Sequence, residues 1–462
     1  MTKNIHVSDL DRLKETISNV CMEEASPDDI AYVDVRVEAG EGIGAFSEDG
    51  KPKGTSQDWG FSLGVRVIDG GEMTEAGYYG KSLGYNDYAN FSDSLHQAIE
   101  YARERARVNA RHKADFVHKF PEFGNSIHST DLAPIDVVQD IVEAEYEIDP
   151  RTVSQKMITE YVQEAAQAAY DYHENVKRVE LVANTTISRQ IFASSEGSLI
   201  DQSQCSTGGT VFITAVDDEM KKPADLYHHT GNQLGFEAIY EGINTHEMNL
   251  IDFAKEIADE TVQLSKAPSA PATDKPVTVV LDPDLVALFA HEIIGHPSEL
   301  DRAMKMETGY AGRSWFFNNM DDTMVGKQVG SSLLNAFSDP TLKGAYGYYK
   351  YDDEGTPAKR VYHIKDGVYH DFMNSRQTAQ IFGKEPNGHY KANDASVVPL
   401  IRMSVSAIES GDQDPQDIIS EVEHGYYAVG HRIPSISESR ENFQISPRLL
   451  YEIKNGEIGQ VY

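Results

Sequence analysis

The stretch HEIIGHP at residues 291–297 combines side chains that bind metal ions and move protons. Neutral imidazole is a common zinc ligand, and a neighbouring glutamate can act as a general base. Zinc lowers the pKa of a bound water to near 7, so a carboxylate can take its proton during attack on a carbonyl and deliver it to the leaving amine. These residue types predict a metal-dependent hydrolase with His291 and His296 as zinc ligands and Glu292 as the catalytic base.

The five-residue spacing of the two histidines is unsuited to a regular helix. Positions i and i+5 are separated by about 140° around an ideal helix, whereas i and i+4 are separated by about 40°. A one-residue bulge or an unwound last turn would bring both imidazoles to one ion, and Gly295 followed by His296-Pro297 is where the sequence permits it. We therefore expect the helix to lose regular α geometry around Gly295. The alternative is a buried helix that happens to contain histidine.

The elements around this stretch are readable from the sequence. PVTVVL at 276–281 is typical of a buried strand, Asp282 is a good N-cap, and Pro283 suits the first helical position. The following residues are apolar nearly all round, which predicts a buried helix that ends at Pro297. Burial makes unpaired histidine and glutamate costly, which favours metal binding or close pairing.

Composition limits the classes of partner. The chain has 462 residues, and its 74 Asp and Glu against 41 Lys and Arg give a formal net charge of −33. Such a surface repels phosphate, and no Lys/Arg block offers a local basic patch, so we expect neither nucleic acid nor a membrane as partner. Only two cysteines occur, and the N-terminus has no apolar segment of signal-peptide type. We expect a cytoplasmic protein.

The chain divides at a Pro/Ala/Ser stretch at 266–276. Before it, amphipathic helices (within 8–26, 90–111, 152–173 and 235–264) alternate with strand-like stretches that have Gly-rich turns. This order predicts an α+β fold: a mainly antiparallel sheet with helices on one side, in an N-terminal domain at 1–270. A β-rich C-terminal domain at 271–462 carries the HExxxH helix, and its Asp366-Gly367 and Asn455-Gly456 pairs predict hairpins with type I′ turns.

HEIIGHPSELDRAM, YDDEGTPAKR, KDGVYHDFMNSRQTA, FGKEPNGHYKA and LLYEIKNGEIGQV resemble, in order and spacing, the TldD/PmbA family of peptidases. GFSLGVRVIDGGEMTEAG and IFASSEG extend the resemblance over nearly the whole chain. The His-Glu motif and DDEGTPA are its specific parts. The resemblance implies dimers, as a homodimer or with a TldE/PmbA-like paralogue, and a cleft for short or unfolded peptides. In the TldD branch, the motif maps one zinc ion per chain onto His291 and His296 and the catalytic role onto Glu292.

The sequence departs from the family at the third zinc ligand. The resemblance implies a cysteine in a Cys-Gly-Lys segment near the C-terminus, and no cysteine follows Cys205 here. Either the sequence is truncated or another group completes the site, because zinc with an open position needs three protein ligands. Glu299 is the nearest candidate, although a surface or capping role is at least as good an explanation. The histidines that follow the motif are further candidates: His363, His370, His389, His424 and His431.

Two interpretations of the remaining residues stay open. DDEGTP is turn chemistry, and its acids (Asp353 and Glu354, with Gly355 at the bend) are expected to be solvated or to line the wall of the substrate cleft. Direct catalysis by them is the less favoured alternative. At the level of function, a zinc metallopeptidase acting on flexible peptides stands beside a non-catalytic peptide-binding or partner-stabilising subunit, which the absent cysteine makes plausible.

Overall fold

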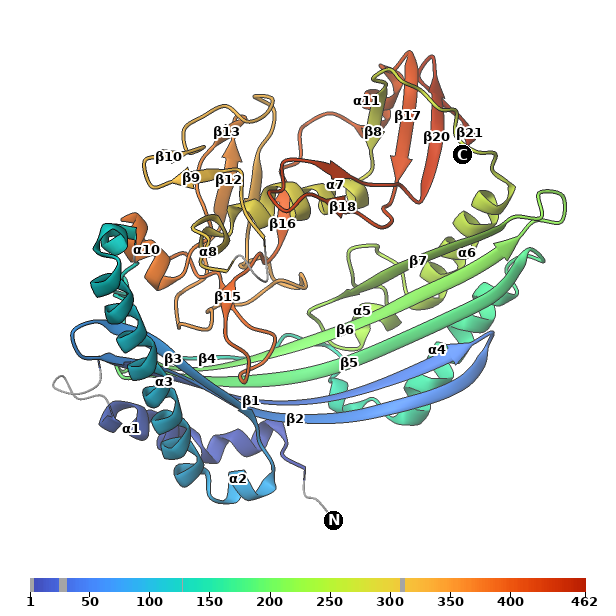
Figure 1. The fold of residues 1–462 in the computed structure, drawn as a ribbon. Coiled ribbons are helices and arrows are strands. Elements are labelled where there is room, and N and C mark those ends of the chain that lie inside the picture. The colour runs from blue at the N-terminus through green and yellow to red at the C-terminus, as the bar shows by residue number, and fades with distance from the viewer. Residues whose placement is uncertain (1–3, 25–30, 127, 308–311) are drawn as a thin grey trace.

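A strongly curved seven-stranded sheet forms the N-terminal half of the chain (Figure 1). The structure is a computed structural model and describes residues 4–24, 31–126, 128–307 and 312–462. The strand order is β3-β2-β1-β5-β6-β4, β7 also pairs with β6, and every pairing is antiparallel except β4 with β6. The strands are β1 (Tyr32–Glu48), β2 (Lys51–Gly70), β3 (Thr74–Ser82), β4 (Gln139–Val142), β5 (Val176–Ser194), β6 (Leu199–Val216) and β7 (Pro223–Asn232).

Helices cover one face of this sheet, as the sequence predicts. Successive strand residues point to opposite faces, so Val35, Ala39 and Ile43 of β1 share one face. The first two belong to the apolar cluster with α1 and α3, and Ile43 belongs to the cluster with α4 and α6. Figure 1 shows α1 and α4 on the outer side of the curve. The helices are α1 (Lys14–Glu24), α2 (Tyr85–Ala89), α3 (Phe91–Lys119), α4 (Gln155–Tyr170), α5 (Glu237–Tyr240) and α6 (Leu250–Lys266).

The expected continuous helix at 235–264 is wrong, because the chain forms two helices there. α5 ends at Tyr240, and Gly242 follows with a φ of +82°, a conformation that interrupts a helix. Asn249 then caps α6 by accepting a hydrogen bond from the backbone N–H of Asp252 at 3.0 Å. Residues 241–249 are mostly polar, and Gly242 is the signal of this break that the sequence contains.

The C-terminal half consists of small sheets and short helices, which confirms the β-rich expectation. One four-stranded sheet has the order β21-β20-β17-β8 and another the order β13-β12-β11-β16. The strands are β8 (Thr278–Leu281), β9 (Phe317–Asn319), β10 (Asp322–Thr323), β11 (Ala336–Ser338), β12 (Val361–Lys365), β13 (Val368–Tyr369), β14 (Tyr390–Lys391), β15 (Leu400–Ile401), β16 (Ser406–Ile408), β17 (His424–Val429), β18 (Ser435–Ile436), β19 (Phe443–Gln444), β20 (Leu449–Lys454) and β21 (Glu457–Val461). The helices are α7 (Pro283–Phe289), α8 (Leu300–Ala303), α10 (Arg376–Phe382) and α11 (Pro415–Ser420).

Residues 267–277 contain neither helix nor strand, and the sheets before and after them are separate. The division into domains at this point stays a prediction. Both expected hairpins are present, with φ of +51° and +75° at Asp366-Gly367 and +51° and +79° at Asn455-Gly456. The expected burial of the strand at 276–281 is wrong, because β8 lies at the edge of its sheet and Val279 is 42% exposed.

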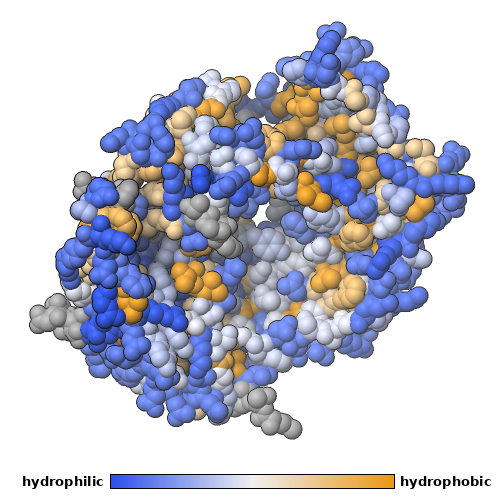
Figure 2. Space-filling model, in the orientation of Figure 1, coloured by the Kyte–Doolittle hydropathy of each residue, from blue (hydrophilic) through white to orange (hydrophobic). Residues whose placement is uncertain are grey.

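The polar face of the large sheet meets the C-terminal half. Arg36 of β1 points away from the helices and donates a hydrogen bond to Asp353 at 3.0 Å. The space-filling view shows that the molecule is hollowed between the two halves (Figure 2). In the part of the chain that the structure describes, no helix combines the length and apolarity needed to cross a membrane.

Candidate metal centre

The helix that carries HEIIGH changes its geometry within the motif. Asp282 caps α7 by accepting from the backbone N–H of Leu285 at 2.8 Å, and Pro283 is the first helical residue, as predicted. The chain then continues as a π-helix at Ala290–Gly295 and as a 3-10 helix at His296–Ser298. The predicted loss of regular α geometry is confirmed. The sequence allowed either a bulge or an unwound last turn, and the structure has the bulge, as a π turn.

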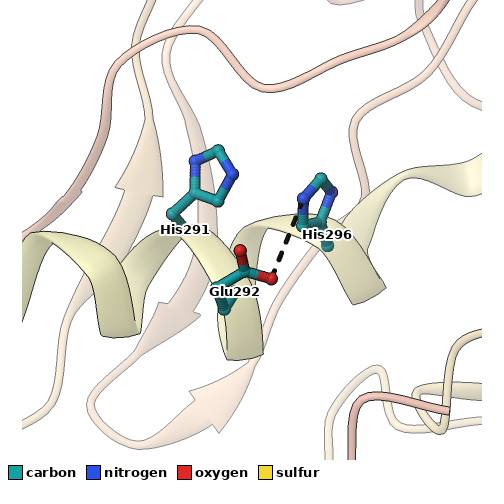
Figure 3. A group of neighbouring side chains, drawn as sticks. All are labelled: His291, Glu292 and His296. Atoms are coloured by element: carbon teal, nitrogen blue, oxygen red, sulfur yellow. Dashed lines mark ion pairs between the residues drawn. The ribbon is translucent and has the colours of Figure 1, made fainter. Parts of the chain in front are cut away.

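The π turn brings the two histidines to one side of the helix. The backbone N–H of His296 donates to the carbonyl of His291, which is the i to i+5 bond of a π-helix. Their ring centroids are 4.7 Å apart, and one ligand atom from each of His291, Glu292 and His296 lies within 4.8 Å of the others. Figure 3 shows both imidazoles projecting from the same side, with the glutamate between them.

Gly295 is required by space and not by its backbone angles. Its φ of −65° and ψ of −60° are helical, but a Cβ there would lie 2.0 Å from Sδ of Met403. The expectation of a buried helix is wrong for its outer side, since Ala287 and His291 are exposed. Protein nevertheless surrounds much of the His291 imidazole. This burial, followed by the interaction with the neighbouring His296, lowers the pKa of His291. A neutral imidazole open to solvent is the form that accepts a metal ion.

Arg440 approaches Glu292 from a distant loop. Its Nη1 donates to Oε2 of Glu292 at 2.7 Å, and that oxygen lies 4.0 Å from Nε2 of His296. Arg440 lies in the turn between β18 and β19 and has a φ of +66°, which is uncommon for a residue other than glycine. Sequence reasoning missed this residue. Only the positive φ marks it as unusual, and one sequence does not reveal that angle.

Glu299 lies behind His296. Its Oε1 is 3.2 Å from Nδ1 of His296, and its Oε2 accepts from Nε of Arg302 at 2.8 Å and from Nη1 of Arg402 at 3.2 Å. Burial acts to raise the pKa of Glu299, but His296 and the two guanidinium groups outweigh it, so the pKa is lowered. An ionised carboxylate on Nδ1 fixes the ring orientation and leaves Nε2 toward Glu292.

The later histidines lie outside the close group formed by His291, Glu292 and His296, whose ligand atoms all lie within 4.8 Å of one another. His363 and His389 are buried, and the Nδ1 atom of each lies 3.1 Å from a backbone carbonyl oxygen. His424 begins β17, far along the chain from the motif. His431 lies beside Asp284 at the start of α7, with Nδ1 3.3 Å from Oδ1.

The acids of DDEGTP are not solvated, so that part of the expectation is wrong. Asp353 accepts from Arg36 and from Nζ of Lys391 at 2.7 Å, and Glu354 pairs with Arg66 of β2 at 2.5 Å. Both carboxylates are buried because they face the polar side of the N-terminal sheet. Gly355 forms the expected bend with a φ of +73°. This cluster anchors the two halves to each other, and contact of these residues with a substrate stays a prediction.

Comparison with known proteins identifies the family of this chain. Models of the PmbA/TldA metallopeptidase domain 1, central domain and C-terminal domain match residues 33–110, 148–266 and 273–462. These segments cover most of the chain. The chain therefore belongs to the TldD/PmbA family.

Several relatives carry metalloprotease names. "Metalloprotease MJ0996" of Methanocaldococcus jannaschii is 26% identical over 431 residues, which are 93% of this chain and 85% of the relative. "Zinc metalloprotease TldD homolog" of Saccharolobus solfataricus is 25% identical over a segment that covers 62% of this chain and 59% of the relative. The crystal structure of TldE from Thermococcus kodakarensis aligns with a TM-score of 0.68 at 17% identity, over 98% of this chain and 89% of that chain. The last comparison shows the fold alone.

Proposed function

We propose that this chain is a zinc-dependent metallopeptidase that hydrolyses flexible or unfolded peptides. His291 and His296 hold one zinc ion, and Glu292 is the general base. The observation that carries the proposal is the π turn, which brings two imidazoles five residues apart to a centroid separation of 4.7 Å beside a carboxylate. The same proposal locates the reaction in the cytoplasm.

The residues of the site fit zinc. Both imidazoles face one side of the helix, and His296 has the carboxylate of Glu299 on its other nitrogen, a partner that ligating histidines commonly have. Bound zinc supplies Lewis acidity for the carbonyl and for the attacking water. If Glu292 is the base, the third protein ligand comes from outside the close group. The family resemblance assigns that ligand to a cysteine of a kind that this sequence lacks after Cys205.

Residues of the chain itself transfer the proton and position the groups that react. Glu292 accepts a proton from the attacking water and delivers it to the leaving amine. Arg440 holds Oε2 of Glu292, which leaves Oε1 for that transfer. Glu299 holds the ring of His296 in place through Nδ1, and Arg302 fixes Glu299 in turn.

One observation favours a second candidate function, a non-catalytic subunit that stabilises a TldD-like or TldE-like partner. Arg440 pairs with the carboxylate expected to act as base, at 2.7 Å. In either function the chain pairs with a second copy or with a TldE/PmbA-like paralogue.

The full chain, with and without a co-expressed TldE/PmbA-like paralogue, distinguishes the two functions. Zinc content and cleavage of a labelled unstructured peptide are measured together. The peptidase predicts about one zinc ion per chain at this site and cleavage that a chelator abolishes. A folded chain that takes up no zinc through His291 and His296 and cleaves nothing, alone or paired, would favour the non-catalytic subunit.

A further inference from the structure

A second group of histidines surrounds a cavity of about 460 Å³ between the two halves of the chain. The cavity lies among β7, α6, the first turn of α7 and the end of β17, and its lining includes His228, His229, His246, Asp284 and Arg448. His431 adjoins it beside Asp284. None of these residues has a part in the proposed peptidase site.

Two buried imidazole nitrogens face the Asp284 carboxylate. Nδ1 of His431 lies 3.3 Å from Oδ1, and Nε2 of His228 lies 3.8 Å from Oδ2. Among the described residues, Nε2 of His228 has no hydrogen-bond partner, although its side chain is only 6% exposed. Buried polar atoms nearly always have a partner, so this nitrogen, facing the same carboxylate as His431, points to a ligand in the cavity.

We propose that His228, His431 and Asp284 form a second metal site, for a divalent transition metal such as zinc. Imidazole and carboxylate are ligands that zinc accepts, and the ligand atoms of a tetrahedral zinc lie about 3.4 Å apart. The separations of 3.3 and 3.8 Å are close to that value. The ring centroids of His228 and His431 are 6.4 Å apart. Binding therefore requires the two rings to move closer together.

Charge favours a cation in this position. Glu260, Asp282 and Asp284 line the cavity against one guanidinium, Arg448, which donates to Glu260 at 3.0 Å and to Asp284 at 2.7 Å.

The three ligands come from separate parts of the chain. His228 lies on β7 of the N-terminal sheet, Asp284 on the first turn of α7, and His431 just after β17. An ion bound by all three joins the N-terminal sheet to the helix that continues into the HEIIGH π turn. We therefore assign it a structural role, separate from the chemistry at Glu292.

Zinc stoichiometry of the full chain tests the proposal. Each protein is saturated with zinc, desalted and measured by mass spectrometry of the metal, with circular dichroism as the check of folding. The wild type should hold two ions, whereas His431→Gln and His291→Gln should each hold one and the double variant none. His246→Gln is the matched control, because its ring lies 5.0 Å from that of His228 and it is not one of the three proposed ligands. It should hold two.

The melting temperature is a second measurement, for the case in which weak binding leaves the zinc content between whole numbers. Zinc should raise the melting temperature of His291→Gln, in which only the proposed second site remains, and should not raise that of His291→Gln/His431→Gln. His228→Gln in place of His431→Gln should give the same result. A wild type with one ion that His291→Gln removes, and His431→Gln does not, overturns this proposal and leaves the peptidase site intact. A single ion that only His431→Gln removes supports the second site and contradicts the zinc site of the proposed peptidase.

Discussion

Arg440 and Glu292 are 148 residues apart in the chain, yet Nη1 of the arginine lies 2.7 Å from Oε2 of the glutamate. The contact depends on the turn between β18 and β19, where Arg440 has a positive φ. Phe443 of β19 packs against Phe289 of α7 with ring centroids 4.7 Å apart, so the turn is fixed over the helix. Arg440 is therefore a positioning residue for Glu292 in the proposed reaction.

Replacement of Arg440 by glutamine should lower kcat for peptide cleavage by about tenfold to a hundredfold, because Glu292 loses the contact that fixes its carboxylate. KM and zinc content should stay unchanged, and Arg440→Lys should recover part of the loss. Arg313→Gln is the matched control, since Arg313 pairs with Glu438 of the same turn at the surface. Wild-type kcat in Arg440→Gln would contradict the positioning role.

The Glu299→Gln variant should distinguish an orienting residue from a zinc ligand. Loss of an orienting carboxylate typically lowers metal affinity by roughly 10- to 100-fold, so zinc should still bind at saturating concentration. Stability should also fall, because buried Arg302 loses its ionic partner. Zinc dissociation constants from competition with a chelator provide the measurement. If saturating zinc leaves the His291–His296 site empty while the fold is intact, Glu299 is a ligand. Glu438→Gln, at the surface, should leave affinity unchanged.

Much of the fold follows from local sequence signals. Alternating apolar residues such as Val35 and Val37 predict a sheet with one covered face, and Asn455-Gly456 predicts its turn. The exposure of β8 could not be predicted, because it follows from the position of β8 at the edge of its sheet. The break after α5 was missed although the sequence contains its signals, since Gly242 stops one helix and Asn249 caps the next.

The candidate site also has features that the sequence predicts and features that it does not. The spacing of His291 and His296 predicts an irregular helix, because only such a helix brings them together. The contacts of Arg440 and Arg302 with this motif depend on how loops pack in three dimensions. Asp353 and Glu354 were expected at a surface because turns are usually solvated, but the polar face of β1 and β2 covers this one.

Gly295→Ala should destabilise the chain and weaken zinc binding, because the added methyl group overlaps Met403. Overpacking of this kind costs about 1–3 kcal/mol, more than the gain in helix propensity from alanine. Unfolding by urea and zinc titration provide the measurements. The double variant Gly295→Ala/Met403→Ala should recover zinc binding. Gly411→Ala, where a Cβ meets nothing within 4 Å, should behave as the wild type.

Glu354→Gln should weaken the junction between the halves. Glu354 is fully buried and pairs with Arg66, which also pairs with Asp34. Breaking a buried pair costs about 3–5 kcal/mol in the free energy of unfolding when the remaining charge has no other partner. Arg66 keeps its pair with Asp34, so the loss should be smaller than that. Glu145→Gln removes an exposed pair with Lys343 and should leave the urea midpoint unchanged. Equal midpoints for the two variants would show that the junction does not depend on this contact.

Glu292→Gln separates chemistry from structure at the metal centre. Glutamine keeps the size of the side chain and an oxygen that can accept from Arg440, but it cannot take a proton from water. Zinc and peptide should still bind, the melting temperature should change little, and turnover should fall by roughly 100-fold to 10,000-fold. If Glu292 is instead a structural anchor, the same change should lower the melting temperature and spare any cleavage. Zinc content, melting temperature and cleavage of an unstructured peptide are measured on the same preparation, because cleavage by a zinc-loaded variant would exclude Glu292 as the base.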